Sequence, residues 1–154
     1  YDENMAEVIA RHQAACCLMQ NREQIDYTDY VEDVLDDLRE SVQIAKAADI
    51  PDDRIMLDPG VGFGKTYEMN LEIIRVVGRL KELGYPVLLG TSRKSVIGLT
   101  LDLPADQREE GTLVTTVLGV EQGCSFVRVH DVEANARAIR MAEAIFREHD
   151  LAVR

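Results

Sequence analysis

The feature that most constrains the fold of this chain is a regular alternation of short apolar runs with longer amphipathic segments. The apolar runs are 15-ACCLM-19, 54-RIMLD-58, 86-PVLLG-90 and 125-SFVRVHD-131. Short, nearly all-apolar runs are typical of buried strands in a parallel sheet that is covered by helices. Because each run is followed by apolar residues at helical spacing, the sequence predicts an α/β fold of four strand–helix units.

The expected helices are marked by apolar residues that recur every three or four positions. One helix is predicted at residues 4–13, before the first strand. The helices after the four strands are marked by residues 31–42, 71–80, 113–118 and 138–145. Gly84 and Gly123 are expected to close the second and third of these, because glycine adopts the left-handed conformation that often follows a helix.

Two architectures are compatible with this order of elements. One is an open doubly wound sheet, and the other is part of a TIM (β/α)8 barrel, whose strand–helix units have this length. Four units would make about half of such a barrel, which should pair with something because an open half exposes its inner face and its edges. No linker or low-complexity segment interrupts the 154 residues, so a single domain over residues 1–154 is expected.

The composition excludes several classes of function. The formal net charge of −11 argues against a general nucleic-acid binder and against a protein drawn to anionic membranes. Cys16, Cys17 and Cys124 form no C-x-x-C pair, so reduced, buried thiols in a cytosolic protein are expected. The sequence shows no signal peptide and no apolar run long enough to span a bilayer. The opening YDENMAEV lacks an initiator Met, which suggests a fragment of a longer protein.

The stretch 57-LDPGVGFGKT-66 resembles a nucleotide-binding loop but has the wrong spacing. A P-loop requires Gly, four residues and then Gly-Lys-Ser/Thr. Counting back from Gly64 and Lys65, the first Gly should stand at a position that is occupied by Pro59. The dinucleotide fingerprint also fails, because Lys65 takes the place of its third Gly. The stretch is therefore a strand end, with Asp58, followed by a turn rich in Pro and Gly.

Polar side chains follow the ends of the predicted strands. Asp58 ends the second strand, 90-GTSRKS-95 follows the third, and Arg128 and His130 alternate with valines in the fourth, so that both point to one face. In parallel α/β folds the active site lies at the carboxyl ends of the strands. A carboxylate can pair with adjacent N–H donors, and cations and His suit a phosphate. With Phe63 nearby, these residues predict a site for a flat, nitrogen-rich heterocycle that carries an anionic group.

Each of these residues also has a purely structural interpretation. Asp58 before Pro-Gly is equally consistent with a turn former or a helix cap. Either Arg93 or Lys94, and not necessarily both, is expected to face the site, and Lys65 is expected to be exposed. The acidic residues of the first long helix are expected to form a solvated face; they are Glu32, Asp33, Asp36 and Asp37.

At these residues the sequence resembles the dihydropteroate synthase family of the folate pathway. The likeness covers essentially the whole chain, including the weaker 18-LMQNR-22. The motifs that carry it, in order and at the right separations, are 57-LDPGVGFGKT-66, 87-VLLGTSRKSVIG-98, 110-EGTLVTTVLGVEQG-123 and 127-VRVHDV-132. The resemblance implies a transferase of TIM-barrel fold that joins the amine of para-aminobenzoate to a dihydropterin methyl pyrophosphate and releases pyrophosphate.

The resemblance also implies roles for particular residues. Asp58 is expected to hydrogen-bond the pterin ring and to offset the charge that develops on it. Lys94 is expected to bind the pterin, and Arg128 to stack on it; with Asp58 they are the expected catalytic residues. Arg128 and His130 are expected to meet the pyrophosphate.

The remaining substrate-binding residues implied by the resemblance surround these four. Phe63 and Ser95 are expected to place para-aminobenzoate, with Ser95 near its carboxylate. Met19 is expected to line the pterin pocket, and Gly90 to let the backbone come close to it.

The chain departs from the family in length and in some motifs. The family is an eight-stranded barrel of nearly twice this length, and this chain resembles its second half, strands five to eight. The early Asn-Val-Thr-Pro-Asp-Ser-Phe segment is absent, and with it the Asn that helps to bind Mg²⁺. The ion is therefore expected from the family, but no metal ligand is expected in this chain. Gln20 stands where many members have His.

The resemblance leaves more than one interpretation open. The first is a cytoplasmic, homodimeric dihydropteroate synthase and sulfonamide target, without nucleic-acid or membrane partners. The second is a non-catalytic pterin-binding half-barrel, or a fragment that needs a partner half. A pterin-binding methyltransferase relative would share the barrel, but the SRK and RVH signatures fit that interpretation less well.

Overall fold

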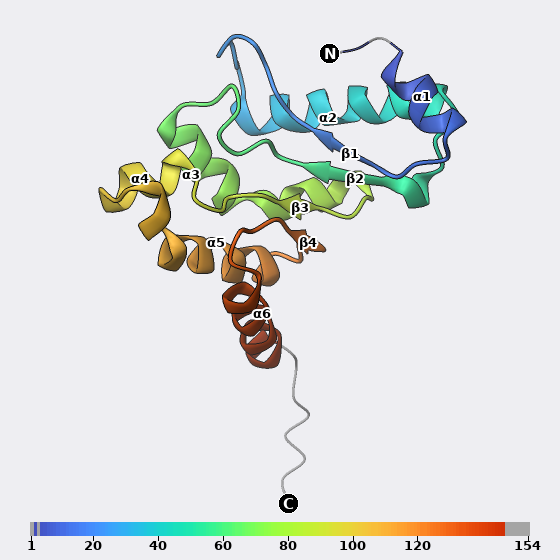
Figure 1. Cartoon of the computed structure of the whole chain (residues 1–154). Helices are drawn as coiled ribbons and strands as arrows, with labels where there is room; N and C mark the ends of the chain where they lie inside the picture. Colours follow the sequence, from blue (N-terminus) through green and yellow to red (C-terminus); the bar gives the residue numbers. More distant parts are fainter. Residues whose placement is uncertain (1, 3, 147–154) are drawn as a thin grey trace, which may run out of the picture.

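The apolar runs form parallel strands and the amphipathic segments form helices in the computed structural model, which describes residue 2 and residues 4–146 (Figure 1). The α/β class predicted from the sequence is confirmed. The strands are β1 (Cys16–Met19), β2 (Ile55–Asp58), β3 (Leu88–Leu89) and β4 (Phe126–Val127). The α-helices are α1 (Met5–Arg11), α2 (Tyr30–Ala47), α3 (Tyr67–Arg75), α4 (Ser95–Leu101), α5 (Glu109–Glu121) and α6 (Val132–Phe146). The 3₁₀ helices are η1 (Asp52–Arg54), η2 (Val77–Leu83) and η3 (Ala105–Gln107).

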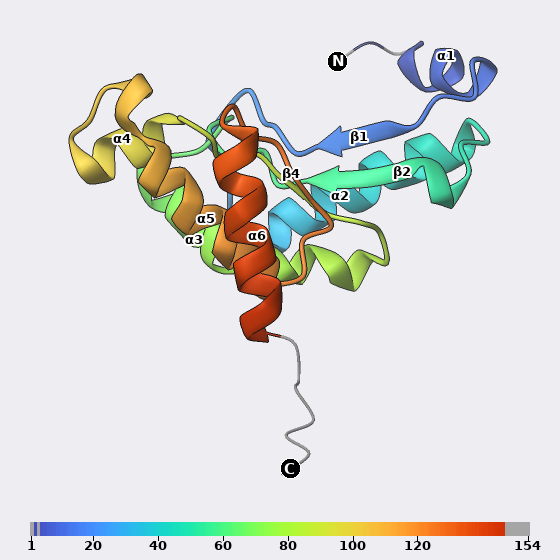
Figure 2. The same cartoon turned by 60° about the horizontal axis from the view of Figure 1, so that its bottom comes forward.

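The strands pair in parallel and in chain order. β1 pairs with β2, with Met19 opposite Asp58 at the carboxyl end, and β3 pairs with β4. A parallel bridge between Leu57 and Val87 joins the two pairs. The arrows of β1 and β2 therefore point the same way in Figure 2, and the carboxyl ends of the strands lie along one edge.

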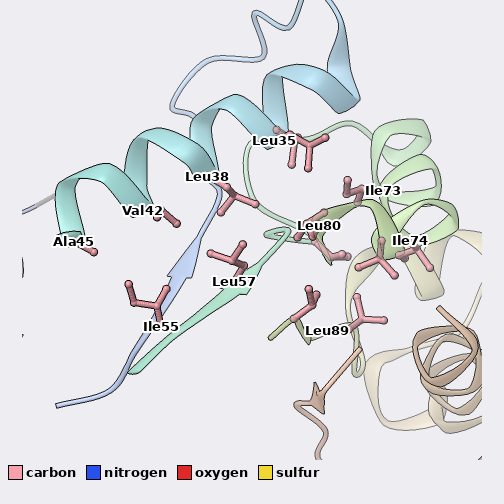
Figure 3. Close-up of a cluster of buried hydrophobic side chains, with 14 of the residues drawn as sticks. Leu35, Leu38, Val42, Ala45, Ile55, Leu57, Ile73, Ile74, Leu80 and Leu89 are labelled. Carbon is pink, nitrogen blue, oxygen red and sulfur yellow. The ribbon is translucent and has the colours of Figure 1, made fainter. Parts of the chain in front are cut away.

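The hydrophobic core lies between the strands and the helices α2, α3 and η2 (Figure 3). α2 contributes Leu35 and Leu38, which recur on one helix face and are fully shielded from solvent. Leu57 of β2 and Leu80 of η2 meet them and are equally buried. Burying each such side chain contributes about 1.5–3 kcal/mol. This core fixes β2, the strand that ends at Asp58.

The first strand departs from the prediction of a buried strand. Cys16 and Leu18 pack against the core, but Cys17 is exposed and Met19 is 36% exposed. Successive side chains of a strand point to opposite faces. Only one face of β1 is packed against the core, so the prediction is wrong for the other face.

Two helices follow β3 where the apolar spacing predicts one. The predicted helix at residues 113–118 lies within α5, whereas α4 was not expected from the sequence. α4 has 7 residues and includes Gly98, whose backbone lies under the guanidinium of Arg108. A segment this short, with a glycine inside it, carries too little periodicity to be recognised as a helix.

The fourth strand is shorter than the predicted run. After Val127 the backbone N–H of Arg128 still donates to the carbonyl oxygen of Leu89, at 3.0 Å, and the chain then leaves β3. Arg128 and His130 therefore follow the strand rather than lie within it.

The helices α2, α3 and α6 are amphipathic, whereas α5 buries mainly threonines. Among the described residues, no helix combines the length and the apolar character that crossing a membrane requires.

Candidate functional site

The carboxyl ends of the strands bring charged side chains from distant parts of the sequence to one edge of the sheet. Asp58 ends β2, Lys94 follows β3 and Arg128 follows β4. Lys94 and Arg128 lie close enough to Asp58 for their charges to favour its ionised form. Lys65, from the loop after β2, acts on Asp58 in the same way, so the edge combines this carboxylate with three cations.

Asp58 is held in a nearly dry position. Asp58 is 3% exposed, and its Oδ1 accepts a 2.7 Å hydrogen bond from the backbone N–H of Gly60. Burial raises the pKa of Asp58, and the Gly60 N–H and the charges of Lys94 and Arg128 oppose that rise. A carboxylate that is shielded from water makes strong hydrogen bonds to neighbouring N–H donors, such as those of a flat heterocycle.

The glycine-rich loop after β2 packs closely on its neighbours. Gly60 has φ +69°, and a Cβ there would overlap the backbone carbonyl oxygen of Gln20. Gly62 has φ +83°, and a Cβ there would lie 3.2 Å from Cδ of Lys94. Both positions require glycine because the backbone is left-handed and the space is filled. The loop thus brings the segment after β1 and the Lys94 side chain together beside Asp58.

Of the two neighbouring cations after β3, only Lys94 faces Asp58. Its ammonium lies 4.4 Å from the centroid of the Phe63 ring, within the range of a cation–π interaction. Burial lowers the pKa of Lys94, and Asp58 opposes this. Arg93 is turned away and donates to both carboxylate oxygens of Asp131, at 2.9 and 3.0 Å.

A cationic cavity of ≈ 270 Å³ lies beside Asp58, between the segments that follow β3 and β4. Lys94, Arg128 and His130 are among its lining residues. Arg128 lies over Gly90, where a Cβ would be 3.1 Å from its Nη2. His130 is held through Nδ1 by the hydroxyl of Ser92, at 2.8 Å. Cationic and N–H groups that converge on a small cavity suit an anion such as a phosphate.

The remaining predicted residues lie at the margins of this cluster. Met19 stands opposite Asp58 in the β1–β2 pair, with its side chain partly open to solvent. Ser95 is the first residue of α4 and is exposed.

A polar network behind the site contradicts two expectations. Arg22 donates to Asp37 through Nε, at 2.7 Å, and through Nη2, at 2.9 Å. Gln20 is 2% exposed and donates to Asp37 at 2.8 Å, while the ammonium of Lys65 donates to the Gln20 Oε1. The expectation of a freely solvated helix face is wrong for Asp37 and also for Asp33, which accepts the backbone N–H of Thr28 at 2.7 Å. The expectation that Lys65 is exposed is wrong as well.

The charges of this network shift the acidity of its members. Burial lowers the pKa of Lys65 to about 8, although Asp58 and Asp37 oppose this. Burial alone would raise the pKa of Asp37, but the hydrogen bonds from Arg22 and Gln20 outweigh it, so that the pKa of Asp37 is lowered. No pattern in the sequence pairs Asp37 with Arg22, because the contact depends on how the segment after β1 folds back over α2.

A larger cavity of ≈ 650 Å³ lies between α3, α4 and α5. Its lining is mainly apolar, with Leu71, Ile97 and Leu118 among its residues, and includes none of the predicted site residues. The cationic cavity beside Asp58, rather than the larger one, is therefore the candidate functional site.

Comparison with known proteins matches this chain to a protein family. The family described as "Pterin binding enzyme" matches residues 1–130. A dihydropteroate synthase from Clostridium beijerinckii is 55% identical over 147 residues, which cover 95% of this chain and 55% of that protein.

Solved structures agree with this match. The crystal structure of a dihydropteroate synthase from Clostridium difficile, in the presence of pteroic acid, superposes with a TM-score of 0.92 at 48% identity, over 96% of this chain and 56% of that one. The dihydropteroate synthase of Thermus thermophilus, in complex with 6HMPPP, gives a TM-score of 0.88 at 36% identity, over 94% of this chain and 58% of that one.

The fold and the match over most of its length define the class of this protein: the chain belongs to the pterin binding enzyme family. Within that family the relatives named above are dihydropteroate synthases. The chain spans little more than half the length of each of them.

Proposed function

We propose that this chain forms the pterin and pyrophosphate side of a dihydropteroate synthase active site. The observation that carries the proposal is the buried carboxylate of Asp58, 3% exposed, beside the cavity lined by Lys94, Arg128 and His130. A shielded carboxylate and an adjacent cationic cavity match a substrate with a flat, nitrogen-rich ring at one end and a pyrophosphate at the other.

In the proposed reaction the amine nitrogen of para-aminobenzoate attacks the methylene carbon of the dihydropterin methyl pyrophosphate. The carbon–oxygen bond breaks, pyrophosphate leaves with the electron pair, and the amine loses a proton. Asp58 binds the ring N–H and amine groups and stabilises the positive charge that the ring gains as the bond breaks. Lys94 binds the pterin, Arg128 stacks on it, and Arg128 and His130 receive the leaving pyrophosphate.

The second substrate is assigned to the side of the site that the glycine loop forms. Phe63, against the Lys94 ammonium, would contact the ring of para-aminobenzoate, and Ser95 would lie near its carboxylate. Met19, opposite Asp58, would line the pterin pocket, and Gly90 leaves room for Arg128.

We further propose that the paired strands are half of an eight-stranded barrel. The exposed side chains of Cys17 and Met19 would then face its interior, where strand residues alternate between the inside and the outside. The homodimer and the cytoplasmic location implied by the family resemblance stay predictions, as does the sensitivity to sulfonamides.

The residues of this site do not fit the magnesium ion that the family implies. Mg²⁺ prefers carboxylate oxygens and water, but the cavity beside Asp58 is lined by cationic and neutral residues. The Asp58 carboxylate is already engaged by Gly60 and faces Lys94 and Arg128, and the Asp131 carboxylate that follows His130 is bound on both oxygens by Arg93. No step is therefore assigned to the ion here.

The test is pyrophosphate release from dihydropterin methyl pyrophosphate, measured with and without para-aminobenzoate. The chain is assayed alone and mixed with the amino-terminal half of the Clostridium beijerinckii relative. Release that depends on para-aminobenzoate in the mixture supports the proposal. Binding of the pterin substrate without release in either sample would favour a non-catalytic pterin-binding protein. If the samples show no binding and no release, both the enzyme proposal and the pterin-binding alternative are refuted.

A further inference from the structure

The ring of His130 is held by a buried hydroxyl to which the proposed reaction gives no role. Ser92 is 7% exposed, and its Oγ lies 2.8 Å from Nδ1 of His130. The same Oγ accepts the backbone N–H of His130 at 3.2 Å. Ser92 therefore joins the segment after β3 to the segment after β4 at two points, both of them on His130.

These two contacts decide which ring nitrogen carries the proton. A hydroxyl has one proton to donate and can accept two hydrogen bonds. Within residues 4–146, both hydrogen bonds of the Ser92 hydroxyl are to His130. In one of them the backbone N–H of His130 is the donor, so the hydroxyl can only be the acceptor there. If Nδ1 were protonated as well, the Ser92 proton would have no acceptor within residues 4–146, and one hydrogen bond of the pair would be lost. The contacts are satisfied when Ser92 donates to Nδ1.

We propose that Ser92 is a positioning residue that holds neutral His130 in the tautomer with its proton on Nε2, so that an N–H donor is presented to the cavity between Lys94 and Arg128. The ring nitrogens lie on opposite sides of an imidazole, so Nε2 points away from Ser92. When the ring becomes an imidazolium, Ser92 accepts from Nδ1 instead, and Nε2 still carries a proton. His130 thus offers a donor to an anion in either protonation state.

The charged groups around His130 leave this donor free for an anion. Lys94 and Arg128 share the cavity with it and are donors only. Asp131, the next residue, is occupied by Arg93 on both oxygens. The identification of the anion as a pyrophosphate rests on the proposed function. The inference about the tautomer of His130 does not depend on that function.

The tautomer can be read from the ¹⁵N NMR spectrum of the histidine rings at a pH of about 8.5, where an ordinary imidazole is neutral. His130 is expected to show a protonated Nε2 and an unprotonated Nδ1, whereas exposed His12 is an internal reference for a freely exchanging ring. A His130→Gln variant assigns the signals. In Ser92→Ala the His130 signals should move to the averaged values of His12. The control is Ser41→Ala, which removes a hydroxyl that donates to the Asp37 carbonyl oxygen, and in this variant the His130 signals should not move. A protonated Nδ1, or averaged signals in the unaltered chain, overturns the proposal.

The consequence for binding is measured by calorimetry with inorganic pyrophosphate. In acid, once the ring is an imidazolium, both nitrogens donate whatever Ser92 does, so the chain and Ser92→Ala should bind alike. At a pH of about 8.5 the variant should bind up to about twofold more weakly, because its ring is shared between two tautomers and only one of them offers the Nε2 donor. A loss that is the same at both pH values would mean that Ser92 has only a structural role. If the unaltered chain binds no pyrophosphate, the proposed function fails for this chain, and the NMR spectrum still decides the tautomer.

Discussion

The two sides of the candidate site are built in different ways. On the β1–β2 side, Asp58 and Gln20 are 3% and 2% exposed, and the network around Asp37 holds the loops that cover them. On the β3–β4 side, Arg128 and His130 are exposed. The acceptor groups of one side are thus packed away from water, although Met19 beside them is partly open, and the other side is an open cationic surface.

This difference corresponds to what each side is proposed to bind. A neutral ring is distinguished by a few hydrogen bonds, which discriminate strongly only when they are fixed and desolvated. An anion is attracted by charge, which acts over about 8 Å even at physiological salt and tolerates solvent. The packed side should therefore be sensitive to small changes in shape, and the open side to changes in charge.

The largest effect is expected from a methyl group placed on the packed side. Gly60→Ala should destabilise the chain by about 3 kcal/mol or more, because the Cβ overlaps the Gln20 carbonyl oxygen and the backbone is left-handed. Gly90→Ala, on the open side, should cost less than about 1.5 kcal/mol, because the flexible Arg128 side chain can move away. Urea unfolding of the two variants measures the difference.

A third glycine separates crowding from backbone strain in this test. Gly84 has φ +84°, and a Cβ there would meet nothing within 4 Å. Gly84→Ala should therefore show the left-handed strain alone, about 1–2 kcal/mol. If Gly60→Ala cost no more than Gly84→Ala, the close contact with Gln20 would not matter, and the packed side would be looser than described.

The next largest effect is expected on binding. Asp58→Asn should weaken the binding of dihydropterin methyl pyrophosphate about 100-fold, because a charged hydrogen-bond acceptor becomes neutral in a dry place. Calorimetry measures the loss, and Asp53→Asn, at an exposed position on η1, is the control. If the affinity were unchanged, the pterin ring would not bind at Asp58.

The same substitution should not lower the stability of the fold. Burial raises the pKa of Asp58, so its ionised form is less favourable in the folded chain than in the unfolded chain. The stability that Asp58 contributes is therefore full below the ordinary pKa of about 3.9 and is lost as the pH rises through the raised value. At neutral pH Asp58→Asn, which keeps an oxygen for the Gly60 N–H, should unfold at an equal or higher urea concentration than the unaltered chain.

The fold could be predicted from the sequence because its signals are local. Apolar periodicity marks α2, and Gly84 and Gly123 do adopt the left-handed conformation, after η2 and α5. The single helix predicted over residues 71–80 is divided between α3 and η2, and α5 buries threonines rather than its apolar residues. α4 could not be predicted, because 7 residues around Gly98 give no clear period. The exposure of Cys17 depends on what packs against each face of β1, which its own residues do not encode.

The candidate site could be predicted only in part, for a related reason. Parallel strands end at one edge, so residues that follow strand ends, such as Asp58, Lys94 and Arg128, can be expected to meet. Asp37 looks like any other acidic residue on a helix, and Lys65 like any other lysine in a loop. Their burial arises from contacts of the segment after β1 with α2, which no spacing within either segment reveals.

A smaller effect on stability is expected within the network itself. Asp37→Asn should cost about 1–2 kcal/mol, because Arg22 and Gln20 lose a charged partner in a partly buried place. Asp36→Asn, one position earlier and exposed, should cost less than about 0.5 kcal/mol. Because the pKa of Asp37 is lowered, its contribution is present above the ordinary value of about 3.9 and is lost as the pH falls through the lowered one. The two variants should therefore differ in urea midpoint at pH 7 and converge in acid; a difference that persists unchanged in acid would contradict the ion pair.

The finest test of the packed side is the titration of Lys65. Burial places its pKa at about 8, whereas the pKa of exposed Lys46 is raised by its hydrogen bond to Asp52. The Cε signals of the two lysines in ¹³C NMR spectra should therefore move in separate pH ranges, with Lys65→Arg to assign the first. Between about 8 and the ordinary lysine value of about 10.4 the unfolded chain binds more protons than the folded one, so the contribution of Lys65 to stability should rise with pH across this range, measured against Lys65→Met. If Lys65 titrated together with Lys46, water would reach the ammonium between Gln20 and Asp58, and the contrast between a dry side and an open side would not hold.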